Sequence, residues 1–345
     1  MNNDSICGMI QDSQNVFSRL GDELSKKIYI ERLLYSMTGD IEHIRNIVRI
    51  GDENKSFLKE ITSGEKIYMW GAGAWGAGIL KVWGDQIEGV VDSDRTKWGG
   101  VLFGKTICSP NTIKASNGCK IMVSSRLHYD SICEDIYKLG FNESQIINAG
   151  LMLDEQAAEQ YLSLDDLPHV SHEVFADIGS LDGKTALRFI DWSGKFSKVY
   201  CFEPDLQNSP KCANNVKMYI ERGKAEVVTK GVWSSSTVLH FNSLGNGMSS
   251  ISDKGTEIQT ISLDEFFKDK DVTFIKMDIE GAELEALKGA RKVITTIKPK
   301  LAICIYHKQE DIFTIPQIIM EYNPDYRFFV RHYSIADGET VLYAI

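Results

Sequence analysis

Twice along this chain of 345 residues, a short apolar segment leads into a glycine-rich stretch, and a later apolar segment ends in an acidic residue. The first copy covers residues 66–92 and the second covers residues 174–203. A short apolar run bounded by glycine is typical of a buried strand in a parallel sheet, and glycine permits the sharp turn from a strand into a helix. The pattern therefore predicts an α/β fold with two parallel sheets, one for each copy.

Length and charge limit the remaining choices. At roughly 150 residues per domain the chain holds about two folded domains, and its 38 basic and 48 acidic side chains give a net charge of −10. Nucleic acid is therefore not expected as a partner. The seven cysteines include no Cys-x-x-Cys pair, so we expect reduced thiols in a cytoplasmic protein. No signal peptide and no membrane span are expected from the apolar pattern.

Four segments are expected along the chain: a helical arm (1–62), a small Rossmann-like nucleotide-binding domain (63–150), a linker (151–172) and a larger domain (173–345). In the arm, apolar residues recur three or four apart from Val16 to Val48, which predicts helices. Gly39 followed by Asp40 can end one helix and cap the next. We expect an α-hairpin that packs against the rest of the chain or pairs two copies in a homodimer.

The first glycine stretch, Gly71-Ala-Gly-Ala-Trp-Gly76, has the order strand, loop, helix, strand and acid, with Asp92 as the acid. Further strands expected at 120–124 and 145–148 would extend the same sheet. This segment resembles the small nucleotide-binding modules of enzymes in bacterial polysaccharide assembly. The resemblance implies a second nucleotide site, in which Gly71, Gly73, Gly76 and Asp92 hold a nucleotide such as NAD, or a nucleotide sugar. The alternative is a module that has lost its ligand and serves as a scaffold or partner surface.

In the second copy, the loop Asp177-Ile-Gly-Ser-Leu-Asp-Gly183 follows a strand, and Glu203 ends the next strand. Further strands are expected near residues 225–229, 272–278, 300–307, 326–332 and 340–345. The last two are joined by a turn too short for a crossover helix, so they are expected to be antiparallel. This combination resembles class I S-adenosylmethionine-dependent methyltransferases, which have a Rossmann-like sheet. The resemblance implies that the cofactor is bound by Asp177, Gly179, Ser180, Gly183, Thr185, Glu203 and Asp278, with Glu203 accepting both ribose hydroxyls.

The stretch Phe274-Ile-Lys-Met-Asp-Ile-Glu-Gly-Ala-Glu-Leu-Glu-Ala-Leu-Lys-Gly-Ala290 is similar to the signature of the FkbM family of methyltransferases. Other segments follow in the order of that family, among them Cys201-Phe-Glu-Pro-Asp205, Tyr306-His307 and Arg331-His-Tyr-Ser334. The resemblance covers about residues 174–345. It implies methyl transfer from S-adenosylmethionine, usually to an oxygen of a sugar or of a polyketide-type natural product.

Three residues are the candidates for catalysis: His307, Asp278 and Glu280. Methyl transfer to a hydroxyl requires groups that align the acceptor and take up its proton, and His307 is the first candidate base. Asp278 and Glu280 would hold the cofactor, orient His307 or bind the acceptor. In the alternative interpretation, Glu280 and Glu283 only complement the amide dipoles of a helix start and His307 only packs. Lys276 is expected to have a structural or carboxylate-pairing role. Asp278 and Glu280 could hold a divalent metal, as in some sugar methyltransferases, but the sequence shows no full ligand set and no metal is assigned.

The function expected from these motifs is methyl transfer to a hydroxyl of a sugar or glycan precursor, in a surface-polysaccharide or natural-product pathway. Two alternatives stay open. An NAD-dependent sugar-nucleotide oxidoreductase would need a Tyr-x-x-x-Lys pair and a substrate lobe, and the chain has no such pair. A scaffold protein that binds a nucleotide sugar would carry a non-catalytic methyltransferase fold, although the cofactor motif is intact. The acceptor, the choice of oxygen, carbon or nitrogen as its methylated atom, and the oligomeric state also stay open.

Overall fold

The computed structural model describes residues 3–51, 54–116, 118–165, 167–245, 249–252 and 254–345. Its contacts divide the chain into two compact units. Unit 1 comprises residues 1–29, 161–331 and 340–345, and unit 2 comprises residues 30–160 and 332–339. The helical arm expected over residues 1–62 is therefore shared between the two units. The break after residue 160 falls inside the stretch where a linker was expected.

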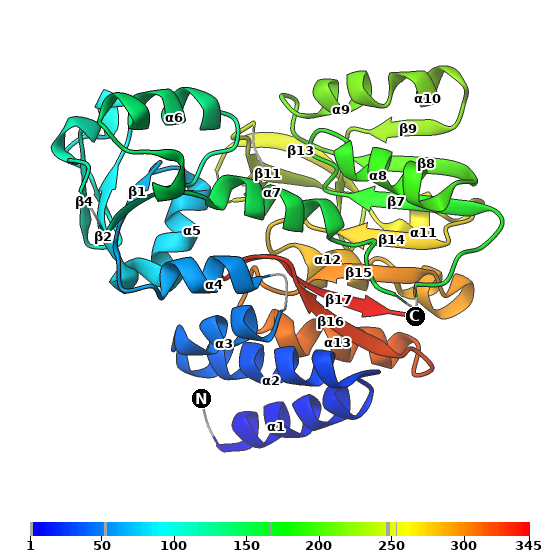
Figure 1. The fold of residues 1–345 in the computed structure, drawn as a ribbon. Coiled ribbons are helices and arrows are strands. Elements are labelled where there is room, and N and C mark those ends of the chain that lie inside the picture. The colour runs from blue at the N-terminus through cyan, green and yellow to red at the C-terminus, as the bar shows by residue number, and fades with distance from the viewer. Residues whose placement is uncertain (1–2, 52–53, 117, 166, 246–248, 253) are drawn as a thin grey trace. The chain divides into compact units, whose positions relative to one another are not determined.

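Unit 1 is built on a seven-stranded sheet in the order β16-β17-β15-β14-β7-β8-β9 (Figure 1). Its strands are β7 (Glu173–Ile178), β8 (Phe196–Phe202), β9 (Ala225–Val228), β14 (Phe274–Met277), β15 (Lys300–Cys304), β16 (Phe328–His332) and β17 (Thr340–Ala344). The five strands from β15 to β9 run parallel, whereas β17 is antiparallel to β15. Arg327 and Ile345 exchange both backbone hydrogen bonds, which is the antiparallel pattern expected for the last two strands.

The central strands of this sheet are buried on both faces, as expected for a parallel sheet covered by helices. Helix α8 (Lys184–Ser193) packs on β7 and β8. There the Phe189 ring stacks on Phe175 with the ring centroids 4.2 Å apart, and Phe274 meets Phe175 edge-on at 5.4 Å. These aromatic contacts anchor α8 against β7 and β14, and so position the loop between β7 and α8.

Between β9 and β14 the chain forms a second sheet, which the sequence analysis did not predict. Its order is β10-β13-β11-β12, with β10 (Gly231–Val232), β11 (Val238–Asn242), β12 (Ser250–Ile251) and β13 (Thr256–Ile261). Two of these strands are only two residues long, and β11 is largely exposed, so no buried apolar run marks them.

The other helices of unit 1 lie mainly in the connections between strands. They are α9 (Ser209–Asn215), α10 (Lys217–Glu221), α11 (Leu263–Phe266), α12 (Glu283–Lys288), a π-helix (Val293–Ile297) and α13 (Asp311–Tyr322). Helix α1 (Asn3–Ser18) packs against α13. The start of the expected helical arm is therefore part of the same unit as the seven-stranded sheet.

Unit 2 contains a six-stranded sheet in the order β3-β4-β2-β1-β5-β6. Its strands are β1 (Lys66–Trp70), β2 (Ile87–Val91), β3 (Val101–Leu102), β4 (Lys105–Cys108), β5 (Cys119–Val123) and β6 (Ile146–Asn148). All neighbouring pairs are parallel except the β3–β4 hairpin, which the sequence analysis missed. Helices α5 (Ala74–Trp83) and α6 (Tyr129–Lys138) follow β1 and β5 in the chain, and Trp70, Ile121 and Ile136 belong to the core.

The arm differs from the expected single α-hairpin. Helix α2 (Glu23–Thr38) ends just before Gly39, which has a φ of +69°, and α3 (Glu42–Ile50) and α4 (Lys55–Ile61) follow. A second break separates α1 from α2, because the Gly21 amide donates to the Phe328 carbonyl at 2.7 Å. The carboxylate of Asp22 then accepts the Ser25 amide at the start of α2. Gly21-Asp22 thus repeats the glycine and acid pair predicted at residues 39 and 40.

The expected linker is helical in its first half, because α7 covers Ala149–Glu159. No helix within the described part of the chain is long and apolar enough to cross a membrane. The six cysteines in that part are free thiols, and Cys7 lies outside the residues whose side chains are described.

Candidate active site

The loop between β7 and α8 turns at two glycines that the sequence analysis singled out. Gly179 has a φ of +79°, and a Cβ added there would lie 1.9 Å from the carbonyl oxygen of Asp278. Gly183 has a φ of +78°, and its added Cβ would lie 3.0 Å from the Cys212 sulfur. Glycine is therefore required at Gly179 for both its backbone conformation and the close approach of β14.

Glu203 follows β8 directly, and its side chain is 5 % exposed. Its carboxylate accepts the Leu181 amide at 2.8 Å and the Asp205 amide at 2.9 Å. Burial raises the pKa of Glu203 to about 7, although these amides oppose the shift. No cation pairs with this carboxylate in the described structure. Glu203 is thus held in place with its charge poorly compensated, which suits a ligand that brings hydroxyl donors and a positive charge.

Asp177 lies at the end of β7 but is fully buried beneath the loop. Lys276, which is also buried, lies with its Nζ 3.0 Å from Asp177 Oδ1 and donates to the Gly179 carbonyl at 2.6 Å. Lys276 therefore pairs with a carboxylate, as the sequence predicts, and this pair supports the loop from below. Ser180 Oγ donates to the Asp177 carbonyl at 2.8 Å, and Thr185 is half-buried in the first turn of α8.

A cleft of about 720 Å³, part of it open to solvent, lies at the carboxyl ends of β7, β8 and β14. Of the predicted site residues, Gly179, Glu203, Asp278 and Glu280 line it. Asp177, Ser180, Gly183 and Thr185 are not among the residues that line this cleft. Residues of the second sheet and its connections complete the wall, among them Lys230, Phe241, Ser249 and Ile258.

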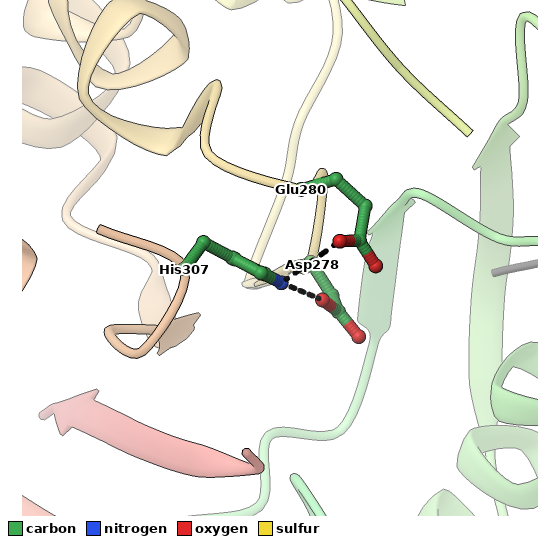
Figure 2. A group of neighbouring side chains, drawn as sticks. All are labelled: Asp278, Glu280 and His307. Carbon is green, nitrogen blue, oxygen red and sulfur yellow. Dashed lines mark ion pairs between the residues drawn. The ribbon is translucent and has the colours of Figure 1, made fainter. Parts of the chain in front are cut away.

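The three candidate catalytic residues meet at one point beside this cleft (Figure 2). Asp278 directly follows β14, Glu280 lies two residues further on, and His307 follows β15. His307 Nε2 lies 3.4 Å from Asp278 Oδ1 and 3.7 Å from Glu280 Oε2. Adjacent parallel strands place their carboxyl ends at the same sheet edge, so β14 and β15 bring these side chains together.

Negative charge dominates around His307, whose side chain is 7 % exposed. Burial lowers the pKa of His307, but the nearby carboxylates of Glu283, Asp278 and Glu280 outweigh this and raise it to about 10. Burial raises the pKa of Asp278, but Lys276 and His307 outweigh it and hold the value below its usual range. The cluster therefore favours a positive charge at its centre, which in the absence of any other cation is a proton on His307.

Two residues of this site were not assigned to it from the sequence. Tyr161, in the expected linker, has a φ of +74° and donates its hydroxyl hydrogen to Asp278 Oδ2 at 2.8 Å. Glu283, interpreted only as complementing a helix start, is fully buried, with Oε1 accepting the Ile279 amide at 2.8 Å and lying 3.0 Å from His307 Nδ1. No pattern in the sequence marks Tyr161, and the burial of Glu283 in the first turn of α12 is seen only in the structure.

The first glycine stretch is held together differently. Asp92 follows β2, and its carboxylate accepts the amides of Ala72 and Asp94 at 2.7 and 2.8 Å and lies 2.9 Å from Lys97 Nζ. Burial raises the pKa of Asp92, but these donors outweigh it and hold the value below its usual range. A Cβ on Gly76 would lie 2.1 Å from the Gly71 carbonyl oxygen, whereas Gly73 has open space. Gly76 and Asp92 thus stabilise the loop itself.

Two protein families match parts of this chain. Residues 173–333 match the family described as methyltransferase FkbM domain, and residues 63–147 match the family described as C2185-like, N-terminal. Residues 173–333 form an FkbM methyltransferase domain. The resemblance drawn from residues 274–290 is thereby confirmed, and with it the expectation of an S-adenosylmethionine-dependent methyltransferase. Every candidate cofactor and catalytic residue named above lies inside the FkbM domain, except for Tyr161.

A solved methyltransferase structure shares this α/β fold. The methyltransferase FkbM from Methylobacillus flagellatus KT is similar over 91% of this chain and 100% of that chain, with 19% identity and a TM-score of 0.52. Fibrillarin from Aeropyrum pernix, solved with natively bound S-adenosyl-L-methionine, is similar over 55% of this chain and 74% of that chain, with 11% identity and a TM-score of 0.37. No curated protein matches the chain. The first of these likenesses extends the shared α/β fold beyond the FkbM domain.

Proposed function

We propose that this protein transfers a methyl group from S-adenosylmethionine to a hydroxyl of a sugar or glycan precursor, in a surface-polysaccharide or natural-product pathway. One observation carries the proposal: a single cleft is lined both by Gly179 and Glu203, the expected cofactor residues, and by Asp278 and Glu280, the expected catalytic carboxylates. A cofactor and an acceptor bound in the same cleft would meet next to the cluster around His307.

The cofactor side of the cleft fits a ligand with vicinal hydroxyls and a net positive charge. Both oxygens of Glu203 are fixed by backbone amides, and each retains a lone pair that a ribose hydroxyl can reach. The absence of a side chain at Gly179 lets the ligand approach the backbone where β7 and β14 end. S-adenosylmethionine supplies the methyl group already activated on a sulfonium.

The acceptor side requires a group that aligns a hydroxyl and removes its proton. During transfer the S–CH₃ bond breaks and an O–CH₃ bond forms, S-adenosylhomocysteine leaves, and the hydroxyl proton passes to a carboxylate of Asp278 or Glu280, because His307 already carries a proton. Such positioning and proton transfer together contribute several kcal/mol to catalysis. Lys230 adds a cation to the same lining, which favours an acceptor that carries a phosphate or carboxylate, such as a nucleotide-linked sugar.

A binding and transfer experiment tests the proposal. Calorimetry should detect S-adenosylmethionine and S-adenosylhomocysteine, and Glu203→Ala should abolish both signals. Glu226→Ala is the matched control, because this exposed acid lies on β9, next to β8 in the same sheet. Radiolabelled cofactor is then incubated with free sugars and nucleotide sugars, and label is expected in at least one acceptor. Failure of the wild-type protein to bind either cofactor form would overturn the proposal.

A further inference from the structure

We propose that Asp278, Glu280 and His307 bind a divalent metal ion at the edge of the cleft. One oxygen or nitrogen from each residue can be chosen so that all three atoms lie within 4.8 Å of one another. Ligand atoms about 2.0–2.2 Å from one ion lie roughly 3–4.4 Å apart, and the distances of 3.4 and 3.7 Å from His307 Nε2 fall in this range. The part this metal plays in catalysis rests on the proposed function, but its binding does not.

Buried atoms without hydrogen bonds provide an independent observation. His307 is more than nine-tenths buried, and its ring nitrogens lie 3.0 Å from Glu283 Oε1 and 3.4 Å from Asp278 Oδ1 without meeting either oxygen in hydrogen-bond geometry. The same holds for Asp278 Oδ1, which faces Nε2. A native protein rarely buries facing polar atoms in this way, because each lost hydrogen bond costs about 1–3 kcal/mol. An ion between them would satisfy both.

The surrounding groups hold the ligand atoms in the orientation that a metal needs. Metal-binding histidines commonly have a carboxylate beside the ring nitrogen that does not bind the metal, and here Glu283 Oε1 lies 3.0 Å from Nδ1. Glu283 is itself fixed by the Ile279 amide. Tyr161 donates to Oδ2 of Asp278, so the other oxygen is directed toward His307. His307 Nε2 and Asp278 Oδ1 therefore face each other because Glu283 and Tyr161 contact the opposite ends of the two side chains.

The donor set indicates the class of metal. Calcium prefers six to eight oxygen ligands, whereas one imidazole with two carboxylates suits a first-row divalent ion such as Mn²⁺ or Zn²⁺. Three protein ligands leave coordination positions for water or for the acceptor hydroxyl. A metal there would lower the pKa of the bound hydroxyl and compensate the carboxylates, so it would prepare the acceptor for methylation.

The test measures metal binding to the full chain directly, without cofactor or acceptor. Mn²⁺ is titrated into the protein, and the free ion is followed by electron paramagnetic resonance. We expect one bound ion per chain, with affinity at least tenfold weaker in Asp278→Asn and in Glu280→Gln. Glu285→Gln is the matched control, because this acid lies in the same helix, pairs with Lys288 and is outside the cluster. Glu283→Gln is expected to weaken Mn²⁺ binding less than either ligand variant.

A parallel titration separates this proposal from the proposed function. S-adenosylmethionine binding is measured by calorimetry in the presence of a chelator, and circular dichroism verifies that each variant is folded. If the wild type binds the cofactor but no Mn²⁺, or if both ligand variants bind Mn²⁺ as tightly as the wild type, the metal site is refuted while methyl transfer stands. If Mn²⁺ binds with the expected losses and the cofactor does not bind, the metal site is supported and the proposed function fails.

Discussion

The two glycine loops of this protein look alike in sequence but differ in how their acids are satisfied. Asp92 accepts two backbone amides and pairs with Lys97, and its pKa is held low. Glu203 also accepts two backbone amides, but it forms no ion pair in the described structure, and burial outweighs the attraction of Lys276 and raises its pKa to about 7. The negative charge of Asp92 is compensated within the chain. The buried carboxylate of Glu203 has no ion-pair partner, so a ligand that supplies hydroxyl donors or positive charge would stabilise it.

The lysines near the two loops, Lys97 and Lys276, also differ in their exposure and in the acid that each pairs with. Lys97 is 37 % exposed and lies beside the acid that follows β2, whereas Lys276 is 3 % exposed and pairs with Asp177 beneath the loop rather than with Glu203. In the first loop the lysine compensates the residue that would contact a nucleotide. In the FkbM domain it supports the loop and leaves the cleft-lining acid free for a ligand. The two loops thus differ in which acid their lysine pairs with: Lys97 pairs with the acid after β2, whereas Lys276 does not pair with the acid that lines the cleft.

The largest expected effect concerns these two lysines. Lys276→Met leaves the Asp177 carboxylate buried without its cation, and breaking a buried pair in this way costs roughly 3–5 kcal/mol of unfolding free energy. Lys97→Met breaks a partly exposed pair, for which about 0–1 kcal/mol is expected. Denaturant unfolding of the full chain, followed by circular dichroism, measures both. Equal losses in the two variants would contradict the assignment of Lys276 as the buried support of the loop.

Alanine in each glycine loop should give the next largest contrast. Gly179→Ala places a Cβ against the Asp278 carbonyl at a left-handed backbone position, and we expect a loss of roughly 2–4 kcal/mol together with loss of cofactor binding. Gly73→Ala meets nothing within 4 Å, so a change below about 0.5 kcal/mol is expected. Thermal unfolding and calorimetry are the measurements. Normal cofactor affinity in Gly179→Ala would show that the loop does not shape the site.

Most of the fold could be predicted because its strands are buried apolar runs bounded by glycine. The seven strands of the large sheet were expected within a few residues of their ends, and the antiparallel end followed from a short turn. The sheet between β9 and β14 and the β3–β4 hairpin could not be predicted, since their strands are short and partly exposed. Exposed strands of two residues depend on pairing with neighbours, which a local pattern does not record.

Only those residues of the candidate site that follow the end of a strand could be predicted from the sequence. Asp278, Glu280 and His307 follow neighbouring strands, so their meeting was foreseeable from topology. Tyr161 could not be assigned, because its contact with Asp278 joins residues 117 positions apart with no shared element. Asp177 was expected at the cofactor, but its carboxylate pairs with Lys276 below the loop. Sequence spacing alone does not say which acid of a loop faces the cleft.

Replacing Glu203 and Asp92 by their amides compares how much each acid contributes to cofactor affinity. Glu203→Gln should weaken S-adenosylmethionine binding by about 10- to 100-fold, or roughly 1.4–2.7 kcal/mol, because the charge and one hydroxyl acceptor are lost. Asp92→Asn removes the same charge from the other loop and should leave cofactor affinity within about twofold of the wild type. Calorimetry of both variants at one pH measures their affinities for S-adenosylmethionine. A comparable loss of affinity in Asp92→Asn would mean that the first loop also serves the cofactor.

The smallest expected effect is the pH dependence of cofactor binding. Because the pKa of Glu203 is about 7, its carboxylate is protonated below that pH and charged above it. The cationic cofactor and its ribose hydroxyls favour the charged form, so affinity should rise with pH through about 7 and then level off. Below pH 7 the dissociation constant should increase by up to about tenfold for each pH unit.

Calorimetry between pH 5.5 and 7.5 measures this dependence, with Glu203→Gln as the variant in which the slope should disappear. The Asp92→Asn profile should match that of the wild type, because Asp92 keeps its charge throughout this range. A wild-type affinity that is flat across the range would show that Glu203 is already ionised before the ligand arrives. Asp92 and Glu203 would then both be charged in the free protein, and the two loops would differ only in that Glu203 lines a cleft.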